Sequence, residues 1–284
     1  GNLSFTSINL PRLGIKHGIC LKERDKADMK GFYEELRNVM DAVRDQLLER
    51  FEIQCNKHTY NFPFLIEQGI WTDGEKLKPT DKLRKILKHG TLTIGFIGLA
   101  ETLTALIGEH HGQSKEAQKL GLEIIKFMRE TCDEYTEKLN LNFSLIATPA
   151  EGLSGRFVNI DASIYGNIKG VTDKKFYTNS FHIPVNFNIS IKNKIELEAP
   201  YHALTNGGHI SYIELDGNTA SNLEAFESII RLMKKSGIGY GAINHPVDRD
   251  PVCGYVGVIG DTCPGCGRHE YEGVPFEEIK GTNC

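Results

Sequence analysis

The sequence lacks the long apolar run that a membrane-spanning helix needs. Crossing a bilayer takes roughly 18 or more consecutive apolar residues, and the best stretch, residues 91–108, contains Glu101 and several glycines and threonines. It also lacks the charged-then-apolar start of a secretory signal. Basic residues are not in surplus, since 33 Lys and Arg stand against 37 Asp and Glu. We therefore expect a cytoplasmic protein with no nucleic-acid or membrane partner.

Cysteine is scarce and unevenly placed. There are seven cysteines, and three of them fall within residues 253–266. An odd number gathered near one end fits thiols and a metal site in a reducing compartment better than a disulfide framework. Internal repeats and low-complexity tracts are absent too, and the 40% hydrophobic, 25% charged composition is that of an ordinary globular protein.

The first half of the chain predicts long helices. Apolar residues recur at three- and four-residue steps through residues 26–51, which indicates an amphipathic helix. A second helix is predicted from Thr80; it becomes apolar all round through residues 94–99 and would run through the middle of the domain. A third begins at Ser114. Before and between them we expect a short strand at 4–13, stopped by Pro11, and an ordered loop at 61–79.

After Asn142 the pattern changes to shorter elements. A helix opens with a capping box of Ser221 and Glu224 and ends at Gly237. The expected strands are residues 143–147, 183–191, 210–215 and 238–244. The order of elements predicts one large α/β domain, residues 1–245, followed by a small metal-binding module, residues 246–284.

The strongest local signal is a pair of cysteine knuckles. Cys263-Pro-Gly-Cys266-Gly is one knuckle, and residues 250–255 have the shape of its partner, with Cys253 in the second ligand position. Structural zinc takes four ligands in tetrahedral geometry, and the spacing is not one of the usual iron–sulfur runs. A rubredoxin-like iron cage is disfavoured because a fourth cysteine is missing from the knuckles. The alternative is a loop with free thiols. The candidates for the fourth ligand are Asp250, His269, His245 and Cys284.

A second signal is the small-residue turn that follows the predicted strand at 143–147. A strand that opens into such a turn can present successive backbone N–H groups and hydroxyls to an anion. The alternative is an ordinary connection between a strand and a helix. The residues that would form the loop are Thr148, Ala150, Glu151, Gly152 and Ser154.

Polar residues also alternate with aromatic ones through residues 176–185. Buried polar groups need partners, so this segment is either a satisfied core network, which we favour, or a strand that contacts a ligand. The pair His110 and His111 is interpreted as a solvated helix end, because adjacent helical residues point in different directions. Cys55 and Cys132 are expected in the core, while the role of Cys20 stays open.

Six stretches, in this order along the chain, are more specific together than any one alone. They are SINLPRL, TPAEGLSGRF, FYTNSFHIPV, ALTNGGHISYIEL, INHPVDRDPVCGYVG and CPGCG. In this combination the chain resembles the catalytic subunit of anaerobic (class III) ribonucleotide reductase, and the resemblance covers nearly its whole length.

The resemblance implies a ten-stranded α/β barrel of the glycyl-radical type. The implied reaction is the reduction of ribonucleoside triphosphates to 2′-deoxyribonucleoside triphosphates. In such a protein a glycyl radical, installed by a separate S-adenosylmethionine iron–sulfur activase, generates a thiyl radical, and formate commonly supplies the reducing equivalents. The full-length protein is expected to be a homodimer, with zinc in the terminal module.

The resemblance also implies roles for individual residues. Residues 148–152, with Ser154 nearby, would hold the substrate phosphates, and Asn9 would face the ribose or formate. Thr178, Asn179 and Ser180 would lie at strand ends at the barrel mouth. Asn206 and Gly207 are expected there as well.

Two departures from the family pattern affect what this chain does alone. The thiyl cysteine of relatives lies upstream of residues 7–13, and their radical glycine lies in a run like R-x-x-G-Y after the knuckles, whereas Gly281 has different flanks. We therefore expect a C-terminal portion that does not turn over by itself. The alternatives are another glycyl-radical enzyme and a non-catalytic, zinc-containing module that docks a protein partner.

Overall fold

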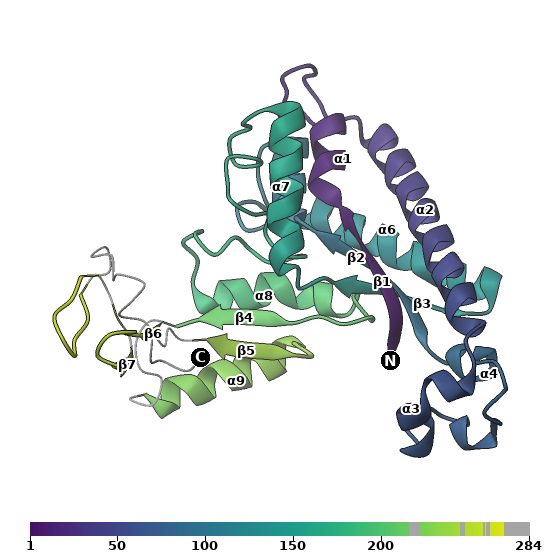
Figure 1. The fold of residues 1–284 in the computed structure, drawn as a ribbon. Coiled ribbons are helices and arrows are strands. Elements are labelled where there is room, and N and C mark those ends of the chain that lie inside the picture. The colour runs from purple at the N-terminus through teal and green to yellow at the C-terminus, as the bar shows by residue number, and fades with distance from the viewer. Residues whose placement is uncertain (216–221, 245–247, 258, 260–261, 270–284) are drawn as a thin grey trace.

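The computed structural model describes residues 1–215, 222–244, 248–257, 259 and 262–269 (Figure 1). Its centre is a parallel sheet in the order β1-β2-β3. The strands are β1 (Asn2–Asn9), β2 (Thr91–Ile97) and β3 (Asn142–Ala147). Helices and strands alternate around this sheet, so the predicted mixed α/β class is confirmed.

The central strand β2 corrects one prediction. The apolar run that was expected to form a buried helix is a strand, and every residue of β2 after Thr91 is buried. A parallel strand covered on both faces reads as a continuous apolar run, which periodicity alone does not separate from a buried helix. Gly98, with a φ of +79°, lies between the end of β2 and the start of helix α5 (Leu99–Ile107).

Two of the long helices predicted from the sequence are confirmed, and both pack against the sheet. Helix α2 (Met29–Cys55) contacts β1 and β2, and α6 (Lys115–Leu139) contacts β3. The Ser114 side chain accepts a hydrogen bond from Ala117 N at 3.2 Å, which confirms it as the cap of α6. Cys55 and Cys132 are 2% and 0% exposed, so both lie in the core as expected.

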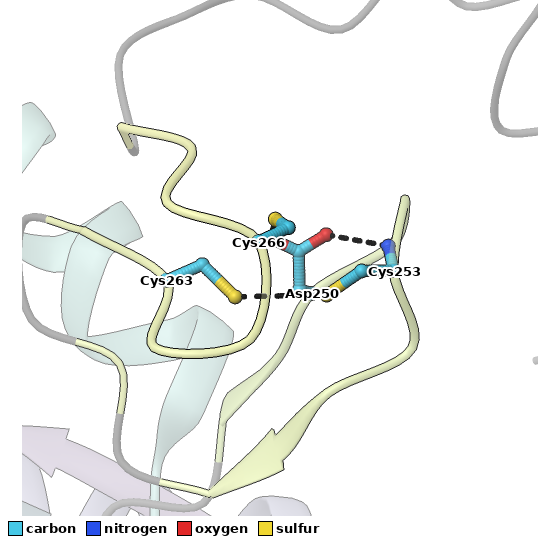
Figure 2. Close-up of side chains that lie close together, drawn as sticks. All are labelled: Asp250, Cys253, Cys263 and Cys266. Atoms are coloured by element: carbon cyan, nitrogen blue, oxygen red, sulfur yellow. Dashed lines mark hydrogen bonds between the residues drawn. The ribbon is translucent and has the colours of Figure 1, made fainter.

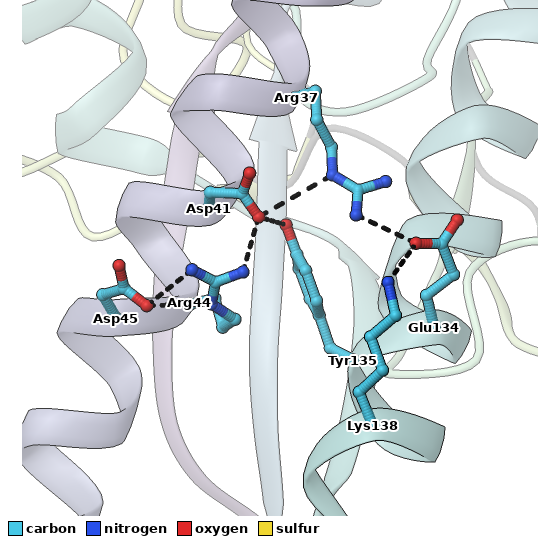
Figure 3. Close-up of polar contacts among 7 residues, drawn as sticks. All are labelled: Arg37, Asp41, Arg44, Asp45, Glu134, Tyr135 and Lys138. Carbon is cyan, nitrogen blue, oxygen red and sulfur yellow. Dashed lines mark hydrogen bonds and ion pairs between the residues drawn. The ribbon is translucent and has the colours of Figure 1, made fainter.

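A polar cluster ties α2 to α6 (Figure 3). Asp41 Oδ1 accepts hydrogen bonds from Tyr135 Oη at 2.7 Å and from Arg44 at 2.6 Å. Arg37 pairs with Glu134 at 2.9 Å. Burial raises the pKa of Tyr135, so its hydroxyl stays protonated and keeps donating. The cluster joins the two helices that cover the sheet.

The connections differ more from expectation. Helix α1 (Leu10–His17) follows β1 directly with Pro11 in its first turn, so this proline ends the strand but also starts a helix. The predicted loop at 61–79 contains short helical turns, and the helix expected from Thr80 is wrong, because α4 begins only at Arg84. The elements between α2 and β2 are η1 (Thr59–Asn61), α3 (Pro63–Glu67), η2 (Gly74–Lys76) and α4 (Arg84–Leu87).

After β3 come α7 (Glu151–Tyr165) and α8 (Ile191–His202). The strand expected at 183–191 is wrong: these residues form turns, and the Ser190 side chain caps α8. Alternating apolar residues gave a strand-like pattern, but Pro184 cannot supply the backbone N–H that a strand needs.

A second, two-stranded parallel sheet follows, formed by β4 (Ser211–Glu214) and β5 (Gly241–Asn244) with α9 (Leu223–Ser236) between them. Gly237 ends α9 with a φ of +82°, as predicted. The expected cap Ser221 is wrong: the cap is Asn222, whose Oδ1 accepts a hydrogen bond from Ala225 N at 3.0 Å, and Ser221 itself lies outside the described residues. A bridge between Ile146 and Gly208 links this part to β3. Strands β6 (Asp248–Arg249) and β7 (Val256–Gly257) pair antiparallel. No helix in the described ranges is long and apolar enough to cross a bilayer.

Candidate active-site edge and metal centre

The carboxyl ends of β1, β2 and β3 lie along one edge of the parallel sheet, beside α1 and α7 (Figure 1). Ligands of open α/β sheets bind at this kind of edge. The segment 178–180 joins it, because Gly98 N donates to Thr178 O at 2.9 Å and Leu99 N donates to Ser180 O at 3.0 Å. The structure therefore brings this predicted segment to the end of β2.

The predicted anion loop lies at the same edge. Ala150 is the N-cap of α7 and has no side-chain group that could accept a hydrogen bond from the first turn. Its own N–H donates to Asn179 Oδ1 at 3.2 Å, which fixes the loop against the 178–180 segment. A Cβ added at Gly152 would meet no atom of a neighbouring segment within 4 Å, so space is open beside the helix start. Backbone N–H groups at a helix N-terminus can bind an anion, so this loop is a candidate anion site.

Two residues of the predicted loop turn inward. The Thr148 side chain is buried, and its hydroxyl lies 2.8 Å from Ser7 Oγ. Ser154 is 3% exposed, and its carbonyl accepts a hydrogen bond from Tyr177 N at 3.4 Å. The open space beside the loop therefore lies at Gly152, in the first turn of α7.

Asn9 is held by a buried carboxylate that was not singled out from the sequence. Asp161 on α7 is fully buried, and its Oδ2 accepts from Asn9 Nδ2 and from Tyr177 Oη, both at 2.8 Å. Its Oδ1 accepts from Arg12 Nε at 2.7 Å. Asn9 also caps α1 through Oδ1, which accepts from Arg12 N at 3.4 Å. Asp161 thus joins the end of β1 to α7.

A second buried carboxylate, Glu101 of α5, holds the 174–180 segment. It accepts from Thr178 Oγ1 at 2.7 Å and from Lys174 Nζ at 2.8 Å, and Thr178 N also donates to it. The signal for this residue was in the sequence, since Glu101 is the one acidic residue in an apolar run. A charge in such a run is retained when it has partners.

Asn206 and Gly207 lie along β3 and pair with its middle. Leu145 N donates to Asn206 Oδ1 at 3.1 Å, and Gly207 N donates to Leu145 O at 2.8 Å. Gly208 O accepts from Ala147 N at 2.9 Å. These residues lie beside β3 and extend the sheet. None of the three hydrogen bonds just described involves the 148–152 loop.

The interpretation of His110 and His111 as a solvated helix end is wrong, because both side chains are buried. His111 Nε2 lies 2.7 Å from Phe181 O, to which it donates. Burial lowers the pKa of His111 to about 4, so the ring is neutral near pH 7. The residues follow the end of α5 and are covered by the 181–187 segment, which local sequence could not indicate.

The cysteine module brings four donor groups together (Figure 2). Ligand atoms of Asp250, Cys253, Cys263 and Cys266 all lie within 4.8 Å of one another. Cys253 Sγ is 3.6 Å from Cys263 Sγ, and Cys266 Sγ is 3.6 Å from Asp250 Oδ2. Three thiols and one carboxylate are a donor set that fits tetrahedral zinc.

The two knuckles share one backbone pattern, with Asp250 in the place of Cys263. Gly254 N donates to Asp250 O at 2.9 Å, and Gly267 N donates to Cys263 O at 2.8 Å. The two glycines also have nearly the same φ, +73° for Gly254 and +74° for Gly267. Asp250 therefore occupies the first ligand position of its knuckle. Of the other candidates, His269 Nδ1 lies 3.1 Å from Thr262 Oγ1, while His245 and Cys284 lie outside the described residues.

The Asp250 carboxylate is buried and its two oxygens have different partners. Oδ1 accepts from Val252 N at 2.7 Å and Cys253 N at 3.1 Å, and Oδ2 lies 3.1 Å from Arg268. Burial opposes ionisation, but the backbone N–H groups of Cys253 and Val252 hold the pKa of Asp250 below its usual range. The group is thus ionised, as a metal ligand must be.

Fold and candidate sites together define an α/β protein whose three parallel strands end at one edge, beside the start of α7, and which carries one aspartate and three cysteines that could hold a metal. A family model described as anaerobic ribonucleoside-triphosphate reductase matches residues 1–277. The chain belongs to this family.

Individual relatives agree with the family match. The chain is 34% identical over 277 residues to the anaerobic ribonucleoside-triphosphate reductase of Salmonella typhimurium, covering 95% of this chain and 37% of that protein. It is 34% identical over 274 residues to the protein of the same name from Enterobacteria phage T4, covering 94% and 42%. The chain thus spans about two fifths of the length of these relatives.

Solved structures show the same fold at lower identity. An anaerobic ribonucleotide reductase structure matches with a TM-score of 0.68 and 21% identity, over 95% of this chain and 38% of that one. The enzyme from Thermotoga maritima with dATP bound in its specificity site also has a TM-score of 0.68, at 20% identity, over 95% and 41%.

Proposed function

We propose that this chain is the C-terminal portion of the catalytic polypeptide of an anaerobic ribonucleoside-triphosphate reductase. The proposed reaction reduces ribonucleoside triphosphates to 2′-deoxyribonucleoside triphosphates by glycyl and thiyl radical chemistry. Residues 1–245 would form part of a ten-stranded barrel, and residues 246–284 a zinc-ribbon-like module. Family membership supports this assignment, and the site geometry supports a role for the chain in holding the substrate.

The observation that supports a substrate site most directly is the meeting of three predicted segments at one sheet edge. Asn9, the 148–154 loop and the 178–180 segment come from distant parts of the chain and are joined there by hydrogen bonds to Asp161 and Asn179. The N-terminus of α7 carries a partial positive charge and uncapped N–H groups, which suit the triphosphate.

The chain's own groups have separable tasks in this proposal. The first turn of α7 binds the phosphates, while the Asn9 carboxamide, oriented by Asp161, faces the ribose or formate. Thr178 and Asn179 keep the loop in place through Glu101 and Ala150. The radical is installed by a separate S-adenosylmethionine iron–sulfur activase, and formate is the proposed reductant. We further propose a cytoplasmic homodimer for the full-length protein.

The metal module has a structural task. Asp250, Cys253, Cys263 and Cys266 would hold zinc, which supplies a cross-link between the two knuckles when bound. The backbone pattern shared by both knuckles presents these donors to one point, so the metal would fix the fold of the chain end without redox chemistry.

Binding of triphosphates to the 284-residue chain tests the proposal. Isothermal titration with CTP, cytidine and inorganic tripolyphosphate should show that CTP and tripolyphosphate bind and that cytidine does not. Gly152→Asp adds a negative charge where space is open and should abolish binding while leaving the melting temperature unchanged or raised, because acidic residues suit a helix start.

Gly1→Asp is the matched control, because it adds the same charge where β1 begins, at the opposite edge of the sheet, and also meets no atom within 4 Å. It should bind like the unmodified chain. If neither CTP nor tripolyphosphate binds the unmodified chain while the metal remains essential for folding, a non-catalytic docking module becomes the better assignment. Equal binding by both variants would exclude the helix start as the phosphate site.

A further inference from the structure

The first residue of the loop is anchored across the central strand. Thr148 Oγ1 and Ser7 Oγ lie 2.8 Å apart, although Thr148 follows β3 and Ser7 belongs to β1, and β2 lies between these strands. Neighbouring strands are about 4.8 Å apart, so two hydroxyls on strands separated by a third meet only if the middle strand leaves the space above it free.

Gly95 leaves that space. It pairs with Ser7 on one side and with Ile146 on the other, and Thr148 lies two residues beyond Ile146, on the same face. A Cβ at Gly95 would collide with Thr148 Oγ1 and lie 2.7 Å from Ser7 Oγ. The hydroxyl contact and a side chain at this position therefore exclude each other.

The backbone gives no other reason for glycine here. Gly95 lies inside β2 and is not one of the glycines with positive φ, so any residue could adopt its conformation. Glycine inside a strand weakens it through the entropy of the unfolded chain. The gain that offsets this cost is the room it leaves for Thr148.

We propose that Gly95 is a positioning residue for the triphosphate loop, an inference that rests on the proposed function of that loop. By leaving room above β2, it lets the Ser7 and Thr148 hydroxyls bond, and this contact sets the point at which the loop leaves the sheet. The direction of the first-turn N–H groups of α7 follows from that point. Thr148 then acts as the loop's anchor, and the phosphates are bound by the backbone beyond it.

The test compares Gly95→Ala with a control of the same chemistry. Gly121→Ala in α6 also adds a methyl group in the buried interior, with its Cβ 2.5 Å from Tyr201 Oη, but away from the loop. Both variants should lower the melting temperature. Only Gly95→Ala should weaken tripolyphosphate binding, by tenfold or more, and Ser7→Ala, which removes the anchor without a clash, should weaken it about threefold.

Hydrogen exchange of the 150–153 amides, measured without nucleotide, separates this inference from the proposed function. These amides should exchange at least tenfold faster in Gly95→Ala than in Gly121→Ala. In Gly95→Ala combined with Ser7→Ala and Thr148→Ala both hydroxyls that the added Cβ would meet are gone, so the melting temperature should recover to that of Ser7→Ala with Thr148→Ala. Absence of tripolyphosphate binding by the unmodified chain would refute the proposed function, whereas equal exchange and equal affinity in the two glycine variants would refute the positioning role.

Discussion

Replacing Asp161 by asparagine is the most direct test of the cluster that holds Asn9. The change keeps the side-chain shape and removes the charge. At present one carboxylate oxygen accepts from Arg12 and the other from Asn9 and Tyr177. Asparagine has one acceptor oxygen and one NH2 group. In either orientation, the asparagine NH2 group would face hydrogen-bond donors, either Arg12 or the pair Asn9 and Tyr177, and could not accept from them.

The expected cost follows from burial. Removing one partner of a buried ion pair costs about 3–5 kcal/mol. Asp161 has a fully buried side chain, but that of Arg12 is 34% exposed. Water therefore solvates part of the unpaired guanidinium, which places the loss near the lower end, at about 3 kcal/mol. Tyr177→Phe keeps the ion pair and removes one hydrogen bond to a charged group, so it should cost about 1.5–2 kcal/mol.

Urea denaturation at pH 7, followed by circular dichroism, measures these differences. Asp133→Asn is the control, because Asp133 pairs with Arg129 on the surface of α6 with 48% of its side chain exposed. Such a pair contributes less than about 1 kcal/mol. If Asp161→Asn and Asp133→Asn lower the free energy of unfolding by the same small amount, the Asp161 carboxylate is not what joins β1 to α7.

Two further predictions concern the metal module and acid stability. Asp250→Ala should weaken zinc binding at least about tenfold in competition with a chelator. Asp250→Cys should restore zinc binding, and His269→Ala should leave it unchanged. Loss of zinc in His269→Ala alone would show that His269 is the fourth ligand. Burial lowers the pKa of His111 and His202 to about 4. Unfolded histidine titrates near 6.5, so the unfolded state binds more protons between these values and stability falls as the pH falls through this window. Between pH 7 and 5 each histidine should cost about 2 kcal/mol of unfolding free energy, and a combined loss below about 1 kcal/mol would show that the rings are accessible to protons when folded.

The elements that could be predicted from the sequence are those with local signals. The amphipathic spacing of α2, the Ser114 cap of α6 and the Gly237 stop of α9 each depend on residues close together in the chain. The central strand could not be recognised in the same way. Since β2 is covered on both faces, it shows no alternation, and its residues match a buried helix equally well.

The partners of the buried carboxylates at the sheet edge could not be predicted, for a different reason. Asp161 lies in a helix whose sequence gives no hint that it meets Asn9, which is 152 positions away. Partners at such a separation are chosen by the order of strands and the packing of α7. Glu101 differs, because an acidic residue within an apolar run already indicates a buried carboxylate with partners, although not which ones.

The candidates for the fourth metal ligand came from the sequence, and the structure distinguishes among them. Spacing alone left Asp250, His269, His245 and Cys284 open, because it does not fix which of these side chains lies beside the three thiols. The backbone separates them: Asp250 and Cys263 each accept a hydrogen bond from a glycine four residues on, and each donates to the residue five positions on, at 2.9 and 2.8 Å. A carboxylate in this position has two oxygens where a thiolate has one sulfur. One oxygen can therefore take the turn's N–H groups while the other faces the metal, so the knuckle keeps both its turn and its anionic donor without a fourth cysteine.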